Sequence, residues 1–409
     1  MSHVDALVEK LCPSGVQFKV LGEIGTIARG KRFVKSDLVE SGTPCLHYGE
    51  IYTRYGVSAH EAFSFLKPDQ AERLRKAAPG DVIIASAGET IEDIGKAVAW
   101  LGRESIVIHD ACYAFRSELD PTYVAYYFQT DDFHNQIRRH IATSKISAIS
   151  TERLAGVRIP TPPLEVQREI VRILDTFSEL EAGLEAELEA RKVQYAHYRT
   201  IVLDRAAERA ELLELGSLGR VVTGHTPKAS FTAAWGSEVD FVTPSDIKDG
   251  MRTVTAPSRH LSSVGAVSMS SSIVPAGSIL VTCIGADMGK TIINSNKCVP
   301  NQQINAIVLN EGIHNGYLFH VLTSLRGALR TQGERGGGTM PLINKSDFSR
   351  ITVPIPPIEI QRLAAAQLDK FDGLVNDLSS GLPAEISARR KQYEYYRDHL
   401  LTFKEQPGE

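Results

Sequence analysis

The side chains of this sequence that could recognise another molecule lie in short polar stretches, several of which contain glycine. Arginine and lysine bind phosphates, arginine can also grip a guanine edge with two hydrogen bonds, and asparagine and glutamine can pair with adenine. Glycine lets backbone amides approach a phosphate closely. These stretches therefore predict contacts with DNA. The candidate residues are Arg29, Lys31, Arg32, Lys35, Arg138, Arg139, Lys145, Thr223, His225, Lys228, Asn301, Gln302, Gln303, Arg335 and Thr339.

Motifs that would carry out a reaction are not evident. The stretch 285–291 resembles a phosphate-binding loop, but three residues separate its glycines where the motif has four, so a turn between two strands is the better interpretation. The Pro-Pro pairs at 162–163 and 356–357 lack the polar and aromatic members of the Asn/Asp-Pro-Pro-Tyr type of motif that grips a base. No H-E-x-x-H or G-x-S-x-G pattern occurs, and the 12 histidines are scattered. We predict no catalytic, cofactor-binding or metal-binding residues in this chain.

The composition is that of an ordinary soluble protein. With 409 residues, 43% of them apolar and 23% charged, the chain is long enough for two or three domains. No apolar run approaches the ~18 residues that span a bilayer, and the first residues do not read as a signal peptide. The five cysteines lie far apart without a C-x-x-C pair, which is typical of thiols in a reducing compartment. We expect a cytoplasmic protein.

The net charge of −4 is unevenly distributed along the chain. Residues 216–350 hold 12 Lys and Arg against 8 Asp and Glu, whereas residues 163–215 hold 7 against 12. Residues 15–150 are nearly balanced, with 16 against 17. The second large segment is therefore compatible with a DNA-binding surface, and the first gives no electrostatic signal for one.

An internal repeat organises the chain. Leu21-Gly22 recurs as Leu215-Gly216, 194 residues later, and the run Pro-Pro-Leu-Glu-Val-Gln-Arg at 162–168 is answered by Pro-Pro-Ile-Glu-Ile-Gln-Arg at 356–362 with the same offset. The pattern Gln-Tyr-x-x-Tyr-Arg at 194–199 recurs at 392–397, so this offset is 198. Agreement in one order at several places indicates a tandem duplication.

Each copy is expected to be a globular segment followed by a long helix. Short apolar runs bounded by Gly, Pro, Asn and Asp, such as 82–84 and 279–281, predict strands in a mixed α/β fold. We predict an N-terminal recognition domain over 1–160, a central helix over 161–212, a second recognition domain over 213–354 and a final helix over 355–409.

The two helical regions carry a coiled-coil pattern. Proline followed by an acidic residue predicts helix starts near 164 and 358, and apolar residues then recur at spacings of three and four. We expect the helices to pack antiparallel, with a kink or break near Gly381 and Pro383. Three tandem tetrapeptides span 180–191. Each adds about one turn, ~6 Å, which favours a spacer of adjustable length, although a simple run of helix-forming residues would have the same pattern.

The arrangement resembles the specificity (S) subunit of type I restriction-modification systems, over essentially the whole chain. The resemblance is carried by the Pro-Pro-Leu/Ile-Glu-x-Gln-Arg helix starts, the Gln-Tyr-x-x-Tyr-Arg ends, and the Leu-Gly-x-Ile/Leu-Gly segments that open the two variable halves. Tandem tetrapeptides in the central helix also occur in that family. This sequence departs from the family pattern in its Leu-Glu-Ala-x unit and in Gly381 and Pro383.

The resemblance implies a division of labour. Each globular half would be a target recognition domain for one part of a bipartite, asymmetric site in double-stranded DNA, and the helices would set the spacing and dock two modification (M) subunits. The M subunits would use S-adenosylmethionine to methylate adenine N6, and restriction (R) subunits would add ATP- and Mg-dependent translocation and cleavage. The chain itself would be non-catalytic.

Two other classes of function remain open from the sequence. The chain could be a coiled-coil scaffold that does not contact DNA, although scaffolding gives no reason for the two globular halves to have diverged. It could also be an enzyme, either a P-loop nucleotidase or a self-sufficient methyltransferase, although the required motifs are incomplete.

Overall fold

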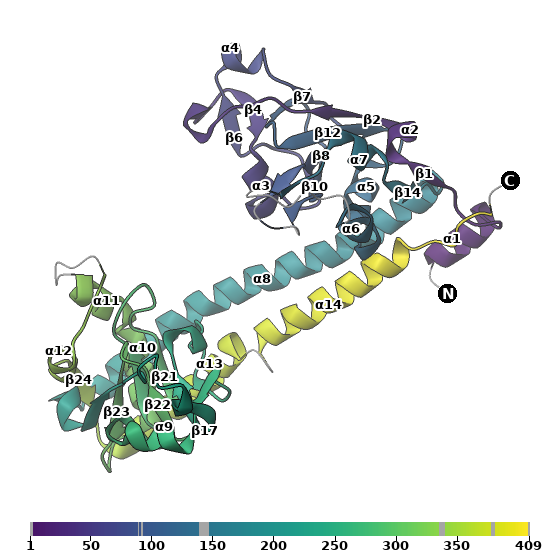
Figure 1. The fold of residues 1–409 in the computed structure, drawn as a ribbon. Coiled ribbons are helices and arrows are strands. Elements are labelled where there is room, and N and C mark those ends of the chain that lie inside the picture. Colours follow the sequence, from purple (N-terminus) through teal and green to yellow (C-terminus); the bar gives the residue numbers. More distant parts are fainter. Residues whose placement is uncertain are drawn as a thin grey trace. The chain divides into compact units, whose positions relative to one another are not determined.

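The computed structural model describes residues 3–88, 90, 93–138, 147–334, 340–377 and 381–407. They form two compact units, one made of Met1–Ala182 with Arg389–Glu409 and the other of Gly183–Ala388. Each unit combines a mixed α/β part with segments of the long helices (Figure 1). The predicted mixed α/β class is therefore confirmed. Among the described residues, no helix has both the length and the apolar character needed to cross a membrane.

The first unit is built around two five-stranded sheets, with strand orders β2–β12–β8–β10–β5 and β3–β6–β4–β11–β7. Val82 and Ile84 of β8 enter one apolar cluster, and Ile83 and Ala85 enter another. Both faces of this strand are thus buried, which explains its uninterrupted apolar run. The strands are β1 Phe18–Val20, β2 Gly25–Arg29, β3 Leu38–Val39, β4 Thr43–Leu46, β5 Ser58–Ala59, β6 Ser64–Leu66, β7 Lys76–Ala77, β8 Val82–Ala85, β9 Ala87–Gly88, β10 Ala97–Trp100, β11 Ile106–Ile108, β12 Cys112–Ser117, β13 Ser147–Ala148 and β14 Arg158–Pro160.

Short helices cover these sheets and lead into the long helix. The helices are α1 His3–Leu11, α2 Leu21–Ile24, α3 Tyr48–Thr53, α4 Pro68–Ala71, α5 Pro121–Tyr127, α6 Asp131–Arg138, α7 Thr151–Ala155 and α8 Leu164–Ala207, with a 3-10 turn at Lys35–Asp37. Pro121 and the Asp120 side chain, which accepts hydrogen bonds from the Thr122 and Tyr123 amides, start α5. Residues 122–127 of α5 are all buried, so this helix forms the core between the sheet and α8.

The second unit repeats this topology. Its main sheet has the order β16–β23–β20–β21–β18, a second sheet has the order β19–β17–β22, and β15 pairs with β24 just as β1 pairs with β14. The duplication predicted from the sequence is thus present in the strand order. The strands are β15 Glu211–Glu214, β16 Gly219–Thr223, β17 Trp235–Val242, β18 Thr253–Val254, β19 Arg259–Leu261, β20 Ile279–Thr282, β21 Thr291–Asn294, β22 Cys298–Pro300, β23 Ile304–Leu309 and β24 Thr352–Ile355.

The helices of the second unit also repeat the arrangement of those in the first unit. They are α9 Ser263–Ser268, α10 Asn315–Ser324, α11 Arg326–Glu334, α12 Lys345–Ser349 and α13 Ile358–Asn376, with 3-10 turns at Leu215–Ser217, Thr232–Ala234, Pro244–Asp246 and Ser270–Ser272. The last helix, α14 Leu382–Leu400, begins in the second unit and belongs to the first from Arg389 on. The predicted break of the final helix is confirmed, because α13 ends at Asn376 and α14 begins at Leu382. The central helix α8 is continuous over 44 residues, about 66 Å at ~1.5 Å per residue.

A buried glutamine explains the repeated Pro-Pro-x-Glu-x-Gln motif. Gln167 and Gln361 are each 1% exposed. Gln167 accepts a hydrogen bond from the Asp120 amide and donates one to the Pro162 carbonyl, and Gln361 makes the same bonds to His314 and Pro356. The motif therefore ties the start of each long helix to the turn that precedes α5 or α10.

The long helices pair inside each unit. In the first, Phe177 of α8 stacks on Tyr396 of α14 with ring centroids 5.5 Å apart, and Glu181, one turn on, pairs with Arg390, nearly two turns back. In the second, Tyr198 of α8 contacts Phe371 of α13 at 4.7 Å. Positions rise on α8 as they fall on α14, so the predicted antiparallel packing is confirmed in the first unit.

Candidate nucleic-acid interface

In both units three loops meet where strands of the two sheets end. In the first unit they follow β2, β4 and β11, and in the second they follow β16, β17 and β22. The strands before the second and third loop pair in parallel, β4 with β11 and β17 with β22, so both loops leave from the same end. Loops positioned by a rigid sheet commonly carry binding residues.

A glycine holds the first loop against the third in each unit. A Cβ atom at Gly30 would lie 2.1 Å from the His109 carbonyl oxygen, and one at Gly224 would lie 1.9 Å from the Asn301 carbonyl oxygen. The next amides, of Lys31 and His225, donate to the carbonyls of Ile108 and Pro300. Lys31 and His225 therefore occupy corresponding positions, as do His109 and Asn301.

In the second unit the structure brings together candidate residues that are far apart in sequence. The Thr223 hydroxyl donates to Asn305 Oδ1 over 2.8 Å, and Thr226 donates to Gln302 Oε1. Asn301 is 8% exposed, and its side-chain amide donates to Gln303 Oε1 over 3.2 Å. Thr223, His225 and the side-chain amides at 301–303 thus form one cluster. His225 and Gln302 of this cluster are exposed, as is the nearby Lys228.

In the first unit the candidates of the first loop also cluster. Arg29 Nε donates to the Asp110 carbonyl over 2.8 Å, and Lys31 Nζ donates to the Arg73 carbonyl over 2.9 Å. Arg29, Lys31, Arg32 and Lys35 are exposed. Arg138 ends α6, outside these three loops, and is also exposed. The candidates Arg139, Lys145, Arg335 and Thr339 lie outside the described residues.

Sequence reasoning missed the aromatic centre of the first cluster. His47 and His109 lie with ring centroids 4.6 Å apart, Phe33 meets His109 edge-on at 5.1 Å, and Tyr48 lies 4.7 Å from His47. Burial lowers the pKa of both histidines, and His109 lowers the pKa of His47 further. Neutral imidazoles beside aromatic rings suit hydrogen bonds to base edges and stacking better than they suit ion pairs with phosphate.

The two clusters share one scaffold with different side chains. His47 is the N-cap of a capping box in which its amide donates to Glu50, and Thr243 is the N-cap of the same kind of box with Asp246. At this position the units therefore have histidine and threonine, and at the position on the third loop they have His109 and Asn301. No local pattern marks His47 as a candidate, because parallel pairing of β4 and β11 alone brings it to His109.

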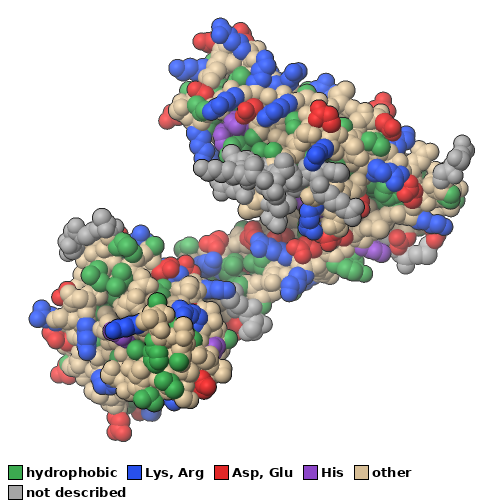
Figure 2. Space-filling view, viewed as in Figure 1, with side chains coloured by type: hydrophobic (Ala, Val, Ile, Leu, Met, Phe, Trp, Pro, Cys, Tyr) green, Lys and Arg blue, Asp and Glu red, His purple; other side chains and the backbone are tan. Residues whose placement is uncertain are grey.

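The first unit also has a basic surface that the balanced charge of residues 15–150 concealed. Residues 29–76 hold nine Lys and Arg against six Asp and Glu. Figure 2 shows Lys and Arg side chains over the end of this unit that carries β4, β6 and α4. The exposed cations of this stretch are Arg29, Lys31, Arg32, Lys35, Arg54, Lys67, Arg73, Arg75 and Lys76. Within the nearly balanced first unit, the excess of positive charge is therefore concentrated in this stretch.

The loop that resembled a phosphate loop is a turn between strands, as predicted. It joins β20 to the antiparallel strand β21, with the Gly289 amide donating to Thr282 and the Thr282 amide donating to Lys290. Lys290 Nζ pairs with Asp287 at 2.8 Å. A phosphate loop is followed by a helix whose N-terminus holds the phosphate, and here a strand follows, so this loop does not support the nucleotidase alternative.

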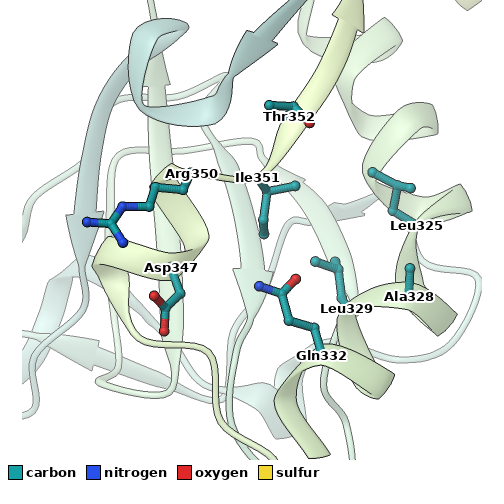
Figure 3. A pocket seen from close by; sticks show the side chains of 8 residues that line it. All are labelled: Leu325, Ala328, Leu329, Gln332, Asp347, Arg350, Ile351 and Thr352. Atoms are coloured by element: carbon teal, nitrogen blue, oxygen red, sulfur yellow. The ribbon is translucent and has the colours of Figure 1, made fainter. Parts of the chain in front are cut away.

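Of two hollows in the second unit, one is lined by candidate residues and the other is not. One, of about 460 Å³, is lined by Asn301 and Gln303 together with Thr243, Ser258 and Arg259. The other, of about 380 Å³, lies between α11, α12 and β24 and contains no candidate residue (Figure 3). Among the described residues no group of three or more His, Cys, Asp or Glu is placed to hold a metal. The five cysteines are unpaired, and four are buried.

A family comparison decides what kind of chain this is. The model of the type I restriction modification DNA specificity domain matches residues 13–190 and 208–388, one match for each copy of the repeat. The chain belongs to this family.

Relatives of this DNA specificity chain agree with that assignment. It is 33% identical over 248 residues to the specificity subunit of the type I restriction enzyme EcoR124I/EcoR124II from Escherichia coli, an alignment that covers 60% of this chain and 61% of that subunit. It is 28% identical over 303 residues to a putative type I specificity subunit from Mycoplasma pneumoniae, covering 70% of this chain and 83% of the relative.

Solved structures show the same fold. The crystal structure of the type I S subunit from M. genitalium matches 95% of this chain and 96% of its own, with a TM-score of 0.52 at 12% identity. A chain from a study of complex assembly and conformational transition of the type I R-M system matches with a TM-score of 0.61 at 17% identity, covering 95% and 97%. The architecture of two α/β domains with long helices is thus that of known S subunits.

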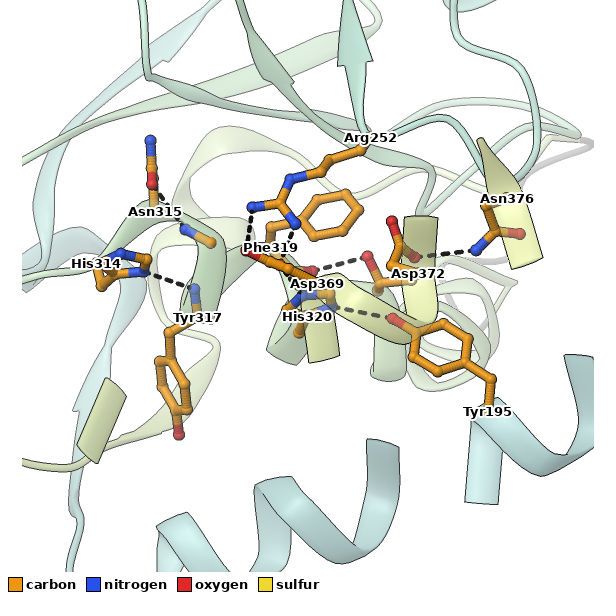
Figure 4. A network of polar contacts seen from close by, with 12 residues as sticks. Tyr195, Arg252, His314, Asn315, Tyr317, Phe319, His320, Asp369, Asp372 and Asn376 are labelled. Atoms are coloured by element: carbon orange, nitrogen blue, oxygen red, sulfur yellow. Dashed lines mark hydrogen bonds and ion pairs between the residues drawn. The ribbon is translucent and has the colours of Figure 1, made fainter. Parts of the chain in front are cut away.

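In the specificity chain a polar network anchors the second recognition domain to its helices (Figure 4). His320 of α10 hydrogen-bonds Asp369 of α13 over 2.7 Å and Tyr195 of α8 over 3.3 Å, and Arg252 makes two hydrogen bonds to Asp369. Burial alone would raise the pKa of Asp369, but the bonds from His320 and Arg252 lower it to about 2. Asp369 is therefore ionised at neutral pH.

The first domain is anchored at equivalent positions by different chemistry. Tyr126 takes the place of His320, 194 residues earlier, and donates to Asp175 of α8 over 2.7 Å. Tyr393 of α14 takes the place of Tyr195 and donates to Gln129 over 3.2 Å. In each unit the first tyrosine of the repeated Gln-Tyr-x-x-Tyr-Arg motif thus hydrogen-bonds to the recognition domain. Tyr393 bonds to Gln129 in the first unit, and Tyr195 bonds to His320 in the second.

Proposed function

We propose that this chain is the DNA-reading subunit of a type I restriction-modification complex, in which each recognition domain binds one half of a bipartite, asymmetric site. One observation carries the proposal: the two units share a loop scaffold and differ in the side chains that it presents. Lys31, His47 and His109 in one unit correspond to His225, Thr243 and Asn301 in the other. A duplicated reader with unlike contact residues suits two unlike half-sites.

The catalytic steps are proposed to belong to partner chains. Two M subunits would bring S-adenosylmethionine and methylate adenine N6 in a base flipped out of the duplex, and R subunits would add ATP and Mg for cleavage. The long helices offer surfaces for such partners, because several of their large apolar side chains are exposed. These are Leu180 46%, Val193 71%, Leu363 65%, Phe371 43%, Leu374 46% and Tyr395 66%. The complex is proposed to act in the cytoplasm.

The helices are also proposed to set the distance between the half-sites. Two domains that enter the same face of DNA bind about one helical turn apart, ~34–36 Å, or a multiple of that distance. A continuous helix such as α8 can fix a distance of this size, because its 44 residues span about 66 Å.

Methylation mapping tests the proposal. The chain is expressed with its M subunits in a host without adenine methylation of its own, and modified adenines are mapped genome-wide. We expect the modified adenines to share one bipartite sequence, in which the bases of the gap between the two parts are not specified. We also expect the purified complex to bind that sequence in a salt-dependent manner. Binding that does not depend on sequence would favour the scaffold alternative, and ATP hydrolysis by the isolated chain would favour the nucleotidase.

A further inference from the structure

We propose that Arg259 reads a guanine in the half-site of the second recognition domain, with its guanidinium held in place by Trp235. Arg259 is not among the residues that the sequence suggested for DNA binding. The inference rests on the proposed function, because it names one base contact within the DNA bound by this domain.

The Arg259 side chain is fixed by an aromatic platform. Its guanidinium carbon lies 3.5 Å from the centre of a Trp235 ring and 5.8 Å from the centre of the Phe241 ring. Trp235 and Phe241 pack edge-to-face at 5.1 Å, so each holds the other. A guanidinium lying on an aromatic face keeps its N–H donors at the edge of its plane, where they can form two parallel hydrogen bonds.

The strands place this arginine beside the candidate cluster. Arg259 begins β19 and pairs with Phe241 of β17, two residues before Thr243. Together with Thr243, Ser258, Asn301 and Gln303 it lines the hollow of about 460 Å³. Arg259 is exposed, and none of the ion pairs between described residues includes it. Its charge is therefore available to a ligand.

The surroundings favour a base over a phosphate. Apart from Asp287, the polar side chains that line the hollow with Arg259 carry hydroxyls or carboxamides, which read base edges, and the Asp287 carboxylate is paired with Lys290 at 2.8 Å. A phosphate site would gather further cations, and among the described residues that line the hollow Arg259 is the only lysine or arginine. A fixed planar fork matches the O6 and N7 acceptors of guanine, which is the commonest specific contact of arginine with DNA.

The first domain has no arginine at the position of Arg259, although Arg54 lies over the neighbouring Phe63 ring at 5.5 Å. Pairing of Cys45 with Ser64 on β4 and β6 corresponds to pairing of Phe241 with Arg259, so serine stands at the equivalent position. The Ser64 hydroxyl donates to Glu50 Oε1 over 2.6 Å and is 9% exposed. Loss of Arg259 should therefore affect recognition of one half-site only.

The test uses the full chain in complex with its M subunits and DNA that carries the mapped site. Relative binding and methylation rates are measured for the cognate site, for each single base-pair change in both half-sites, and for 7-deazaguanine at each guanine, which removes the N7 acceptor. We expect the unaltered complex to discriminate at one G·C pair of the second half-site by roughly 5- to 150-fold. Arg259→Ala should abolish that discrimination and the effect of 7-deazaguanine there. Arg259→Lys should lower both, because lysine cannot form the paired bonds.

Two further variants separate recognition from folding. Trp235→Ala should weaken discrimination at the same base pair, since it removes the platform. Arg220→Ala is the matched control, because Arg220 is an exposed arginine on β16 of the same unit and does not line the hollow; it should leave the discrimination unchanged. Circular dichroism and thermal melting confirm that each variant is folded.

The outcomes distinguish this inference from the proposed function. Uniformly weaker binding of Arg259→Ala to every sequence would mean a phosphate contact, and it would overturn the inference while leaving the DNA-reading function intact. The same follows if the second half-site contains no G·C pair, or if its preferences do not change. Failure of the unaltered complex to distinguish any sequence would instead refute the proposed function.

Discussion

At two positions the recognition scaffold leaves no volume for a side chain. The loops at Gly30 and Gly224 pass so close to the third loop that a Cβ would overlap a carbonyl oxygen. Neither residue needs an unusual φ angle, so the requirement is one of space alone. In each unit this glycine sets the distance between the first and third loops. It therefore also sets the position of Lys31 or His225 at the candidate interface.

Substitution of Gly224 on this scaffold should therefore lower the free energy of unfolding far more than substitution of Gly183 on α8. Gly224→Ala should lower the free energy of unfolding by about 3 kcal/mol or more, because the backbone must move. Gly183→Ala on α8, where a Cβ meets nothing within 4 Å, should raise it by about 0.5–1 kcal/mol. Urea denaturation of the two variants compares these values. Equal effects would show that the loops adapt and that the close approach is not needed.

The two histidines of the first domain should make its stability depend on pH. Their folded pKa values are lowered from 6.5, so below about pH 6.5 the unfolded chain binds more protons, and stability falls as pH decreases through the folded pKa values. Trp235→Phe leaves buried Trp100 as the sole tryptophan. In that background the fluorescence melting temperature should fall from pH 7 to pH 5.

The second domain supplies the control for this titration. His47→Thr with His109→Asn introduces the residues that occupy the same positions on the second scaffold, and it should flatten the melting-temperature profile between pH 7 and pH 5. An unchanged slope would assign the pH dependence to other groups, such as His134, whose pKa burial also lowers.

At the scale of elements, proline and glycine made the helix boundaries predictable. Pro-Pro-Leu-Glu set the start of α8 at Leu164, and Gly381 with Pro383 marked the interruption between α13 and α14. These are local backbone effects, which a sequence displays directly. The meeting of His47 with His109, and of Trp235 with Arg259, depends on strand pairing between distant segments, and no local pattern records such pairing.

The tetrapeptides of α8 give a prediction about spacing. Deletion of residues 184–187 removes one unit of the 180–191 repeat within a continuous helix, which shortens it by ~6 Å and turns it by about 40°. We expect the gap in the methylated sequence to shorten by one or two base pairs, since successive pairs are ~3.4 Å apart, while both half-sites stay the same. Adenine methylation mapping measures the gap. An unaltered gap would show that α8 does not set the distance.

At the scale of the whole molecule, the duplication was readable because motifs recurred in order, but the sequence boundaries do not describe the packing. The first compact unit takes residues from both ends of the chain, Met1–Ala182 and Arg389–Glu409. Leu400 and Leu401 belong to its apolar core at 8% and 3% exposure. A linear division into recognition domains and helices cannot express this, because contacts across about 390 residues complete the core.

The last residues of the chain should therefore stabilise the first unit, most of which lies hundreds of residues earlier in the sequence. The Val16 amide donates to the Lys404 carbonyl, the Gln406 amide donates to the Val16 carbonyl, and Glu405 pairs with Arg158. Removal of residues 398–409 takes away these bonds and two buried leucines, each worth about 2 kcal/mol or more. Hydrogen exchange should then accelerate in β1, β14 and the start of α8, while β20 and β23 of the second unit keep their protection. The double substitution Glu405→Ala with Lys404→Ala keeps the leucines and should have a much smaller effect. Acceleration spread evenly over both units would mean that the tail acts on the chain as a whole, contrary to its packing against the first unit.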